Sequence, residues 1–151
     1  MAQQTISTGT SANDGTGDTL RSAGTKINQN FTELYSRQQR ITETVSTASL
    51  ANNAAGDIVL DSCGKSFVLH EVKPDRAAWI RIYTDTASRT AGDSNGAIFD
   101  YTTIGDSAVK VAPGTIAWVD SAQTTIPVKI VNKSGSTSAV ALRVKALKLE
   151  V

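Results

Sequence analysis

The stretch NDGTGDTLRSAGTKINQNFTELY, residues 13–35, joins a lead rich in glycine and aspartate to an amphipathic segment. The apolar positions of this segment are alternately four and three residues apart, and the spacing continues into the forties. A narrow apolar stripe held over this length is typical of a helix that packs against partner helices. The stripe consists of Leu20, Gly24, Ile27, Phe31, Leu34, Gln38, Ile41 and Val45.

The residues around this stripe predict where the helix begins and ends. Asp18 is suited to be the N-cap, because its carboxylate accepts a backbone N–H at the positive end of the helix dipole. Thr, Val and Ser, which are weaker helix formers, are frequent after Ile41, and Asn52, Asn53 and Gly56 end the segment. We therefore expect a flexible polar arm over residues 1–17, a helical stalk over 18–55 and a β-domain over 56–151.

Two interpretations of the stripe remain open. In one, the helix packs on its own β-domain; in the other, it forms a parallel bundle with copies of itself. Gln38 favours the bundle, because one polar layer in an apolar seam fixes register and oligomeric state. The same eight stripe residues are then the predicted oligomer interface.

From residue 57 onward the apolar pattern changes to a period of two, which is typical of half-buried strands. Turn-forming residues separate the segments, and no helical pattern lies between them. We expect an antiparallel β-sandwich, with Trp79 and Trp118 anchoring its core. The segments are 58–61, 66–72, 78–85, 108–112, 115–120, 125–131 and 139–151. The predicted fold class is thus mainly β with a long, coiled-coil-like N-terminal helix.

Composition argues against several classes of partner. The net charge is +1 and no basic block is present, whereas nucleic-acid binding requires a basic stripe. No run approaches the roughly 18 apolar residues of a membrane span. The N-terminus lacks the basic and apolar regions of a signal peptide. We expect neither nucleic acid nor membrane as a partner.

The chain offers little for catalysis or metal binding. Cys63 is the only cysteine and His70 the only histidine, so neither a disulfide nor a cysteine or two-histidine metal site forms within one chain. Gly64-Lys65-Ser66 lacks the upstream glycine and following helix of a phosphate-binding loop and is predicted to be a turn. We expect no enzyme activity, no cofactor and no metal.

Residues 13–35 resemble a segment of structural proteins from tailed bacteriophages, above all those that infect cyanobacteria. The shared pattern is NDGTGD-x-LR-x-A-x-x-K-x-N-x-NF-x-ELY, with Gly24 as the departure. Residues 77–91, AAWIRIYTDTASRTA, resemble a segment of the β-domains in the same proteins. The resemblance implies a homotrimer and a virion component that is made in the host cytoplasm. It also implies a virion-attachment segment of Asn13, Asp14, Gly15, Thr16, Gly17 and Asp18.

Two classes of function follow from the resemblance. In the first, the chain is a structural protein that decorates or cements the head, or attaches a fibre or neck piece, with other capsid, neck or tail proteins as partners. In the second, the β-domain is the tip of a tail fibre and binds a host-surface glycan. The candidate glycan contacts are Tyr83, Asp85, Arg89 and Tyr101.

Overall fold

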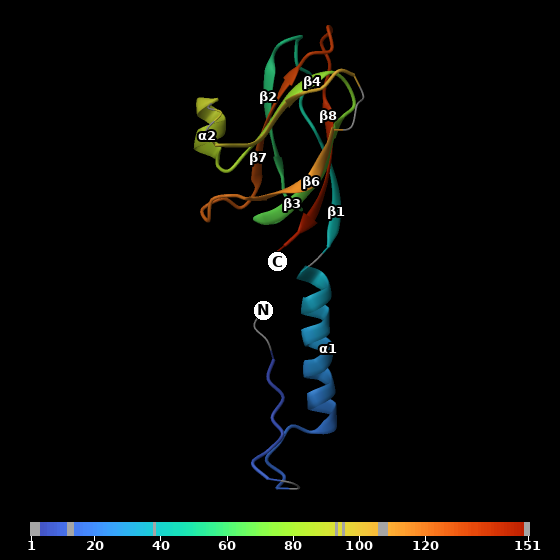
Figure 1. Ribbon diagram of the computed structural model, residues 1–151, viewed down its shortest axis with the longest axis vertical. Coiled ribbons are helices and arrows are strands. Elements are labelled where there is room, and N and C mark those ends of the chain that lie inside the picture. Colours follow the sequence, from blue (N-terminus) through green and yellow to red (C-terminus); the bar gives the residue numbers. More distant parts are fainter. Residues whose placement is uncertain are drawn as a thin grey trace. The chain divides into compact units, whose positions relative to one another are not determined.

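The computed structural model describes residues 4–11, 14–37, 39–92, 94, 96–105 and 109–149 of the chain. The chain divides into two compact units, Met1–Gln38 and Gln39–Val151, and each is described by itself. Asn13 and Gln38, which the sequence analysis singled out, lie outside the described residues. The first unit holds a helix, whereas the second is built mainly from strands (Figure 1).

The helix of the first unit, α1, spans Leu20–Arg37. Thr19 Oγ1 accepts a hydrogen bond from Ser22 N at 3.2 Å, so the N-cap is Thr19 rather than Asp18. At 1.5 Å per residue, α1 is about 27 Å long. An amphipathic helix at this place is confirmed, but the prediction that it extends into the forties is wrong.

The segment after α1 is strand β1, Arg40–Ser46, which pairs antiparallel with β8, Ala141–Lys148. Its residues alternate between exposed and half-buried positions, and its sequence RITETVS contains four β-branched side chains, which fit a pleated surface better than a helix. Val45 packs against the core of the second unit. Ile41 and Val45 therefore do not continue the helical stripe, because a tertiary partner strand decided their backbone conformation.

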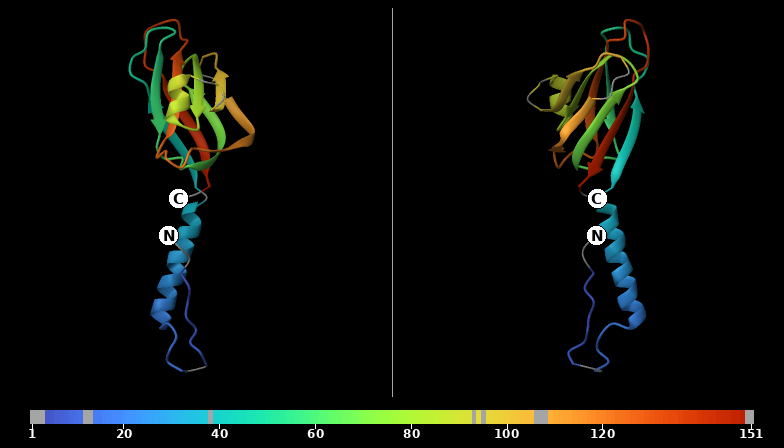
Figure 2. Two further views of the ribbon diagram at one scale, coloured as in Figure 1. Left: turned by 90° about the vertical axis from the view of Figure 1, so that its left-hand side faces the viewer. Right: turned by 45° about the vertical axis from the view of Figure 1, so that its right-hand side comes forward.

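The second unit is a sandwich of two four-stranded sheets, with strand orders β1-β8-β3-β6 and β2-β7-β4-β5 (Figures 1 and 2). Every pairing within the sheets is antiparallel. This confirms the predicted antiparallel β-sandwich. The remaining strands are β2 Ala55–Leu60, β3 Ser66–Pro74, β4 Ala78–Tyr83, β5 Ala97–Thr102, β6 Val109–Trp118 and β7 Ile126–Asn132.

The core lies between the two sheets, where apolar side chains at alternate strand positions meet. In β8 the residues Leu142, Val144 and Ala146 are fully buried, as their alternation predicted. Ile80 of β4 and Val128 of β7 are buried from the opposite sheet. The strand pattern of the sequence therefore identified the inward face correctly in these strands.

Both tryptophans lie outside this core, contrary to the prediction. Trp118 is 67% exposed, and its neighbour Ala117 takes the inward position of β6. Trp79 is half-buried on the outer face of β4, where the Arg81 guanidinium lies 4.0 Å from its ring centre. The large buried aromatic residues are instead Tyr83 and Phe67.

Local structure between β4 and β7 also differs from the prediction. Residues 86–91 form a short helix, α2 (Thr86–Ala91), whose N-cap Asp85 accepts a hydrogen bond from Ser88 N at 2.7 Å. Strand β5 follows in a segment with no predicted strand. Strand β6 runs through Pro113, which the sequence analysis placed in a turn. Proline is tolerated there because β6 is an edge strand.

The β1–β2 side of the sandwich is closed by Glu43, whose carboxylate accepts hydrogen bonds from Asp61 N at 2.7 Å and Ser62 N at 3.0 Å. Cys63 lies beside this carboxylate and is fully buried. Burial, together with the nearby Glu43 charge, raises the pKa of the Cys63 thiol to about 12. Cys63 is therefore a structural residue of the closed side.

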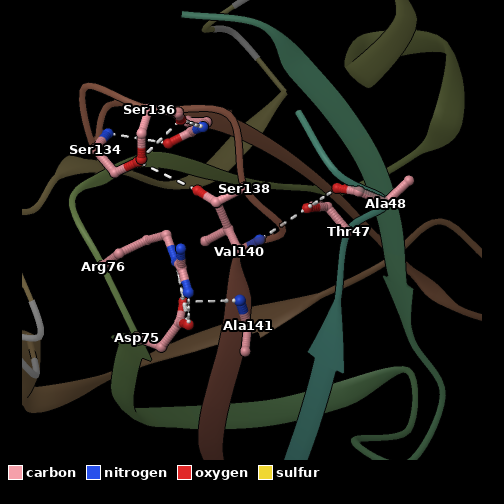
Figure 3. A network of polar contacts seen from close by, with 10 residues as sticks. Thr47, Ala48, Asp75, Arg76, Ser134, Ser136, Ser138, Val140 and Ala141 are labelled. Atoms are coloured by element: carbon pink, nitrogen blue, oxygen red, sulfur yellow. Dashed lines mark hydrogen bonds and ion pairs between the residues drawn. The ribbon is translucent and has the colours of Figure 1, made fainter. Parts of the chain in front are cut away.

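Polar contacts fix the entry into β8 (Figure 3). Val140 N donates to Thr47 Oγ1 at 3.0 Å, and Ala141 N donates to Asp75 Oδ1 at 2.9 Å. The neighbouring Arg76 guanidinium lowers the pKa of Asp75 below its usual value. These contacts hold the chain after β1 and the chain after β3 to the same start of β8.

Candidate functional site

The loop before α1 is organised around the carboxylate of Asp14. This carboxylate accepts hydrogen bonds from the backbone N–H groups of Thr10 at 2.6 Å, Ser11 at 2.7 Å and Thr16 at 2.9 Å. The Thr10 hydroxyl donates a further bond at 2.7 Å. This hydrogen-bonding, with Thr10 as the largest cause, holds the pKa of Asp14 well below its usual value.

Asp18 joins the polar arm to the first turns of α1. Its Oδ2 accepts hydrogen bonds from Ser7 N and from Lys26 Nζ, both at 2.7 Å, and its own backbone N donates to Ser7 O at 2.8 Å. The Lys26 hydrogen bond is the largest cause that lowers the pKa of Asp18. Lys26 Nζ also donates to Thr5 O at 3.0 Å.

Asn30 holds the beginning of the described arm. Its Oδ1 accepts from Gln4 N at 2.8 Å, and its Nδ2 donates to Gln4 O at 2.9 Å. The arm thus runs back along α1 from the loop towards Asn30 (Figures 1 and 2). We call the side-chain contacts of Asp14, Asp18, Lys26 and Asn30 with the arm the clasp.

Gly17 is required by the close approach of two backbone segments within the clasp. A Cβ atom at this position would lie 3.0 Å from Ser7 O, Thr8 C and Gly9 N. Such contacts are tighter than nine in ten real Cβ contacts, and backbone atoms yield less easily than a flexible side chain. The GTGD segment is therefore explained by packing inside the first unit.

The composition of residues 1–17 predicted an arm that becomes ordered only against a partner. In the structure, the partner of residues 4–11 includes the chain's own helix. Sequence analysis did not single out Lys26 or Asn30 as functional residues. The signal that identifies them is the spacing of Asp18, Ser22, Lys26 and Asn30, which are four residues apart and therefore lie along one side of the helix.

The apolar stripe of α1 lies on a different side from the clasp. At about 100° per residue, Gly24, Ile27, Phe31 and Leu34 fall within about 40° of Leu20 around the helix axis. Ser22, Lys26 and Asn30 fall about 200°, 240° and 280° on from Leu20 by the same count. The arm therefore leaves the stripe uncovered.

The exposure of the stripe residues agrees with this placement. Leu20 is 91% exposed, Leu34 61%, Phe31 52% and Ile27 42%. A Cβ added at Gly24 would meet nothing within 4 Å. These five residues of the predicted interface share one helix face, whereas Ile41 and Val45 belong to β1.

The predicted attachment segment is used largely within the chain. The carboxylates of Asp14 and Asp18 are engaged in the clasp, and Gly17 is packed against the arm backbone. Gly15 and Thr16 are exposed at the loop. Of the predicted attachment residues that the structure describes, only these two present an open surface.

The four candidate glycan contacts do not form one exposed surface. Tyr83 is fully buried, and Asp85 caps α2. Arg89 donates to Ile58 O at 3.1 Å and lies 3.5 Å from the Asp57 carboxylate. Tyr101 is 50% exposed on the edge strand β5.

Two further properties of the described part of the chain bear on its class. Within it, no three His, Cys, Asp or Glu side chains gather in a way that would hold a metal ion. No helix in the same residues is both long and apolar enough to cross a membrane.

A comparison of sequences identifies the family of this chain. Residues 3–146 match the family described as "Bacteriophage T4 gp9/10-like protein, N-terminal". The chain belongs to this family. It is therefore a bacteriophage structural protein, a component of the virion, and the family points to the tail, baseplate or fibre. No curated protein matches the chain.

Proposed function

We propose that this chain is a non-enzymatic assembly protein of the phage tail, baseplate or fibre, and that it works as a homotrimer. Three parallel copies of α1 pack through Leu20, Gly24, Ile27, Phe31 and Leu34. The observation that carries the proposal is the exposed apolar stripe on a helix whose other side is occupied by the arm. A trimer is chosen over a dimer because of the family resemblance.

The physical basis is the burial of apolar surface between chains. A single helix of this length is marginal in water, and packing of its apolar face supplies most of its stability. Burial of a side chain such as Phe or Leu contributes about 1.5–3 kcal/mol. Several such residues on each helix are enough to favour association, and Gly24 allows the backbones to approach closely.

Phe31→Asp tests the helical contact, with Thr32→Asp as the matched control. Both variants introduce the same charge at adjacent positions, but Thr32 lies about 100° around the helix from Phe31. We expect Phe31→Asp to be monomeric in native mass spectrometry and Thr32→Asp to stay trimeric, with both sandwiches folded by circular dichroism. Trimers of Phe31→Asp would show that the chains meet elsewhere.

The first unit also carries the proposed attachment to the particle. Because the arm is clasped to α1, it meets its virion partner as a folded loop with Gly15 and Thr16 at its surface. Deletion of residues 1–17 is expected to abolish incorporation into particles and to leave the trimer intact, since every stripe residue follows residue 17. Full occupancy of the truncated protein on virions would refute this part of the proposal.

The position on the particle is tested by gold-labelling of intact virions with an antibody against the sandwich. Label at the tail, baseplate or fibres is the expected result. Label over the head would indicate a decoration or cement protein instead, and label at the neck would indicate a neck piece. The resemblance to proteins of cyanophages stays a prediction, which growth of the parent phage on a cyanobacterial host would test.

A further inference from the structure

The outer face of the sheet β1-β8-β3-β6 carries an apolar patch. Val68 of β3 points outward, because its neighbours Phe67 and Leu69 are buried in the core. Val68 is the cross-strand partner of both Ile116 and Leu147, so these three side chains form a row on the same face. The outer patch consists of Val68, Ile116, Trp118, Leu147 and Leu149.

Three members of the outer patch are well exposed in the single chain. Ile116 is 69% exposed, Trp118 67% and Leu149 39%. Trp118 lies opposite Ser66, whose carbonyl accepts a hydrogen bond from Leu149 N at 2.9 Å, so these residues adjoin the Ile116 row. Exposed neighbouring apolar side chains of this kind mark interaction surfaces in soluble proteins.

The outer patch includes an edge of the sheet that needs protection. Strand β6 is the last strand in its sheet, and its residues 115–118 line a groove of about 220 Å³ together with Thr84 and residues 96–98 at the start of β5. Natural proteins protect long apolar edge strands with charges, bulges or a covering partner. Pro113 and an irregular register beside the Leu69–Thr115 pair interrupt the edge earlier in β6, whereas Ile116 and Trp118 leave its last residues uncharged and exposed. A covering partner would protect this part of the edge.

The outer patch lies at the end of the sheet where β1 begins. The row of Ile116, Val68 and Leu147 ends at Arg40, the first residue of β1 and the partner of Leu147. Gln39 O accepts a hydrogen bond from Lys148 N at 2.9 Å, so one residue separates the end of α1 from this ladder. In the figures, β1 begins and β8 ends at the same end of the sandwich (Figure 1).

The position of the outer patch indicates which partner would cover it. Packed helices lie about 8–10 Å apart, so parallel association of α1 brings the Arg40 ends of the copies close together. The short connection gives the neighbouring sandwiches a high effective concentration for one another. Surfaces that adjoin Arg40 are then the first to meet, and the outer patch is one of them.

We propose that the outer patches of neighbouring copies pack together about the axis that α1 sets, as a second subunit contact after the helical one. The partner is another copy of this chain. The proposal rests on the helical association proposed above, and it adds a contact that the helix alone does not require.

Acrylamide quenching of Trp118 fluorescence tests this contact. The full chain with Trp79→Phe carries Trp118 as its only tryptophan, because the chain has two. We expect a severalfold lower quenching constant in the oligomer than in the Phe31→Asp form of the same chain. Equally strong quenching in an oligomer and in the Phe31→Asp monomer would show that Trp118 is exposed in both, which would overturn the patch contact and leave the helical contact standing.

The other two outcomes of the quenching experiment also overturn the proposal. A chain that is monomeric before the Phe31→Asp change would overturn the patch contact together with the proposed trimer. A Phe31→Asp monomer in which Trp118 stays as shielded as in the oligomer would show that the chain itself covers the patch, for instance with α1.

Ile116→Glu provides an independent test that needs no change at Trp79. Ile116 is mostly exposed, so the sandwich tolerates the substitution, but a charge in the patch opposes its burial between chains. We expect the dissociation constant of the oligomer to rise by at least about tenfold, equivalent to 1.4 kcal/mol. Ser46→Glu, on the same outer face but at the other end of β1 from Arg40, is the matched control and is expected to leave the constant unchanged. Equal constants for the two variants would overturn the proposal.

Discussion

The two units of this chain differ in the interactions that stabilise each of them internally. The sandwich buries a continuous apolar core between its sheets, and polar contacts such as those of Glu43 lie at its margins. The first unit has the opposite arrangement, because its polar side chains hold the arm to α1 while its apolar side chains are exposed. The core of the sandwich is thus complete within a single chain, whereas the apolar stripe of the first unit is still to be covered.

This contrast fits the proposed assembly, in which α1 makes the first contact between chains and the sandwich keeps a fixed shape. A sandwich with a full core keeps one shape whether or not its partners are present. In the proposed trimer, a helix with an exposed stripe gains most from association, because its apolar surface would then be buried between chains. The clasp keeps the arm from covering the stripe within its own chain.

The largest expected effect is a loss of stability in the sandwich when a core side chain is shortened. Leu142→Ala removes a fully buried side chain of β8 and is expected to lower the free energy of unfolding by about 2–5 kcal/mol. Urea denaturation, followed by the circular dichroism of the strands, measures this loss. Ile104→Ala, at a residue that is 89% exposed, is the control and is expected to change little. A small loss for Leu142→Ala would mean that the sheets are not packed against each other as described.

A smaller effect is expected from a substitution that opens the clasp and leaves the sandwich unchanged. Gly17→Ala places a methyl group 3.0 Å from three backbone atoms of the arm, so the hydrogen bonds between Ser7 and Asp18 are expected to be lost. Each such bond contributes about 0.5–1.5 kcal/mol. Hydrogen exchange of the Ser7 and Asp18 amides should accelerate, while amides of the sandwich keep their protection.

Gly24→Ala is the matched control for the clasp, because a methyl group there meets nothing within 4 Å in the single chain. It is expected to leave the Ser7 and Asp18 amides as protected as before. Unchanged exchange in Gly17→Ala as well would contradict the close backbone approach on which the clasp depends.

Acid provides the mildest way to open the clasp within the first unit. The pKa values of Asp14 and Asp18 are lowered in the folded chain, so the clasp gains stability from their ionised forms. This stabilisation is complete above the unfolded pKa of about 3.9 and is lost as the pH falls through the lowered folded values. The Thr10, Ser11 and Thr16 amides should therefore lose protection at strongly acidic pH. Asp14→Asn should weaken this pH dependence, and an identical acid profile in that variant would exclude Asp14 as its source.

Sequence patterns predicted the parts of the fold in which local preference and tertiary environment agree. The stripe of α1 and the alternation of β8 belong to this group. Residues 40–46 did not, because the spacing of Ile41 and Val45 fits a helical stripe as well as an alternating strand. The ladder with β8 decided between the two, and it is formed by residues about a hundred positions away along the chain.

The candidate site shows the same limit. The sequence identified residues 13–18 as a distinct segment, but only the structure placed Asp14 and Asp18 in contacts with the arm. It also separated Tyr83, Asp85, Arg89 and Tyr101, which are close in sequence but differ in burial and contacts. Proximity along the chain could not reveal this, since alternate residues of a strand face opposite sides of a sheet.

The sequence by itself determined the apolar helix face and the antiparallel strands, because these depend on local periodicity. Only the tertiary structure decided where α1 ends, which side of the helix the arm takes, and that Trp118 lies on the outer face of β6. Each of these depends on a partner distant in sequence. The energy of such a contact is absent from the local pattern and appears only when the two segments meet.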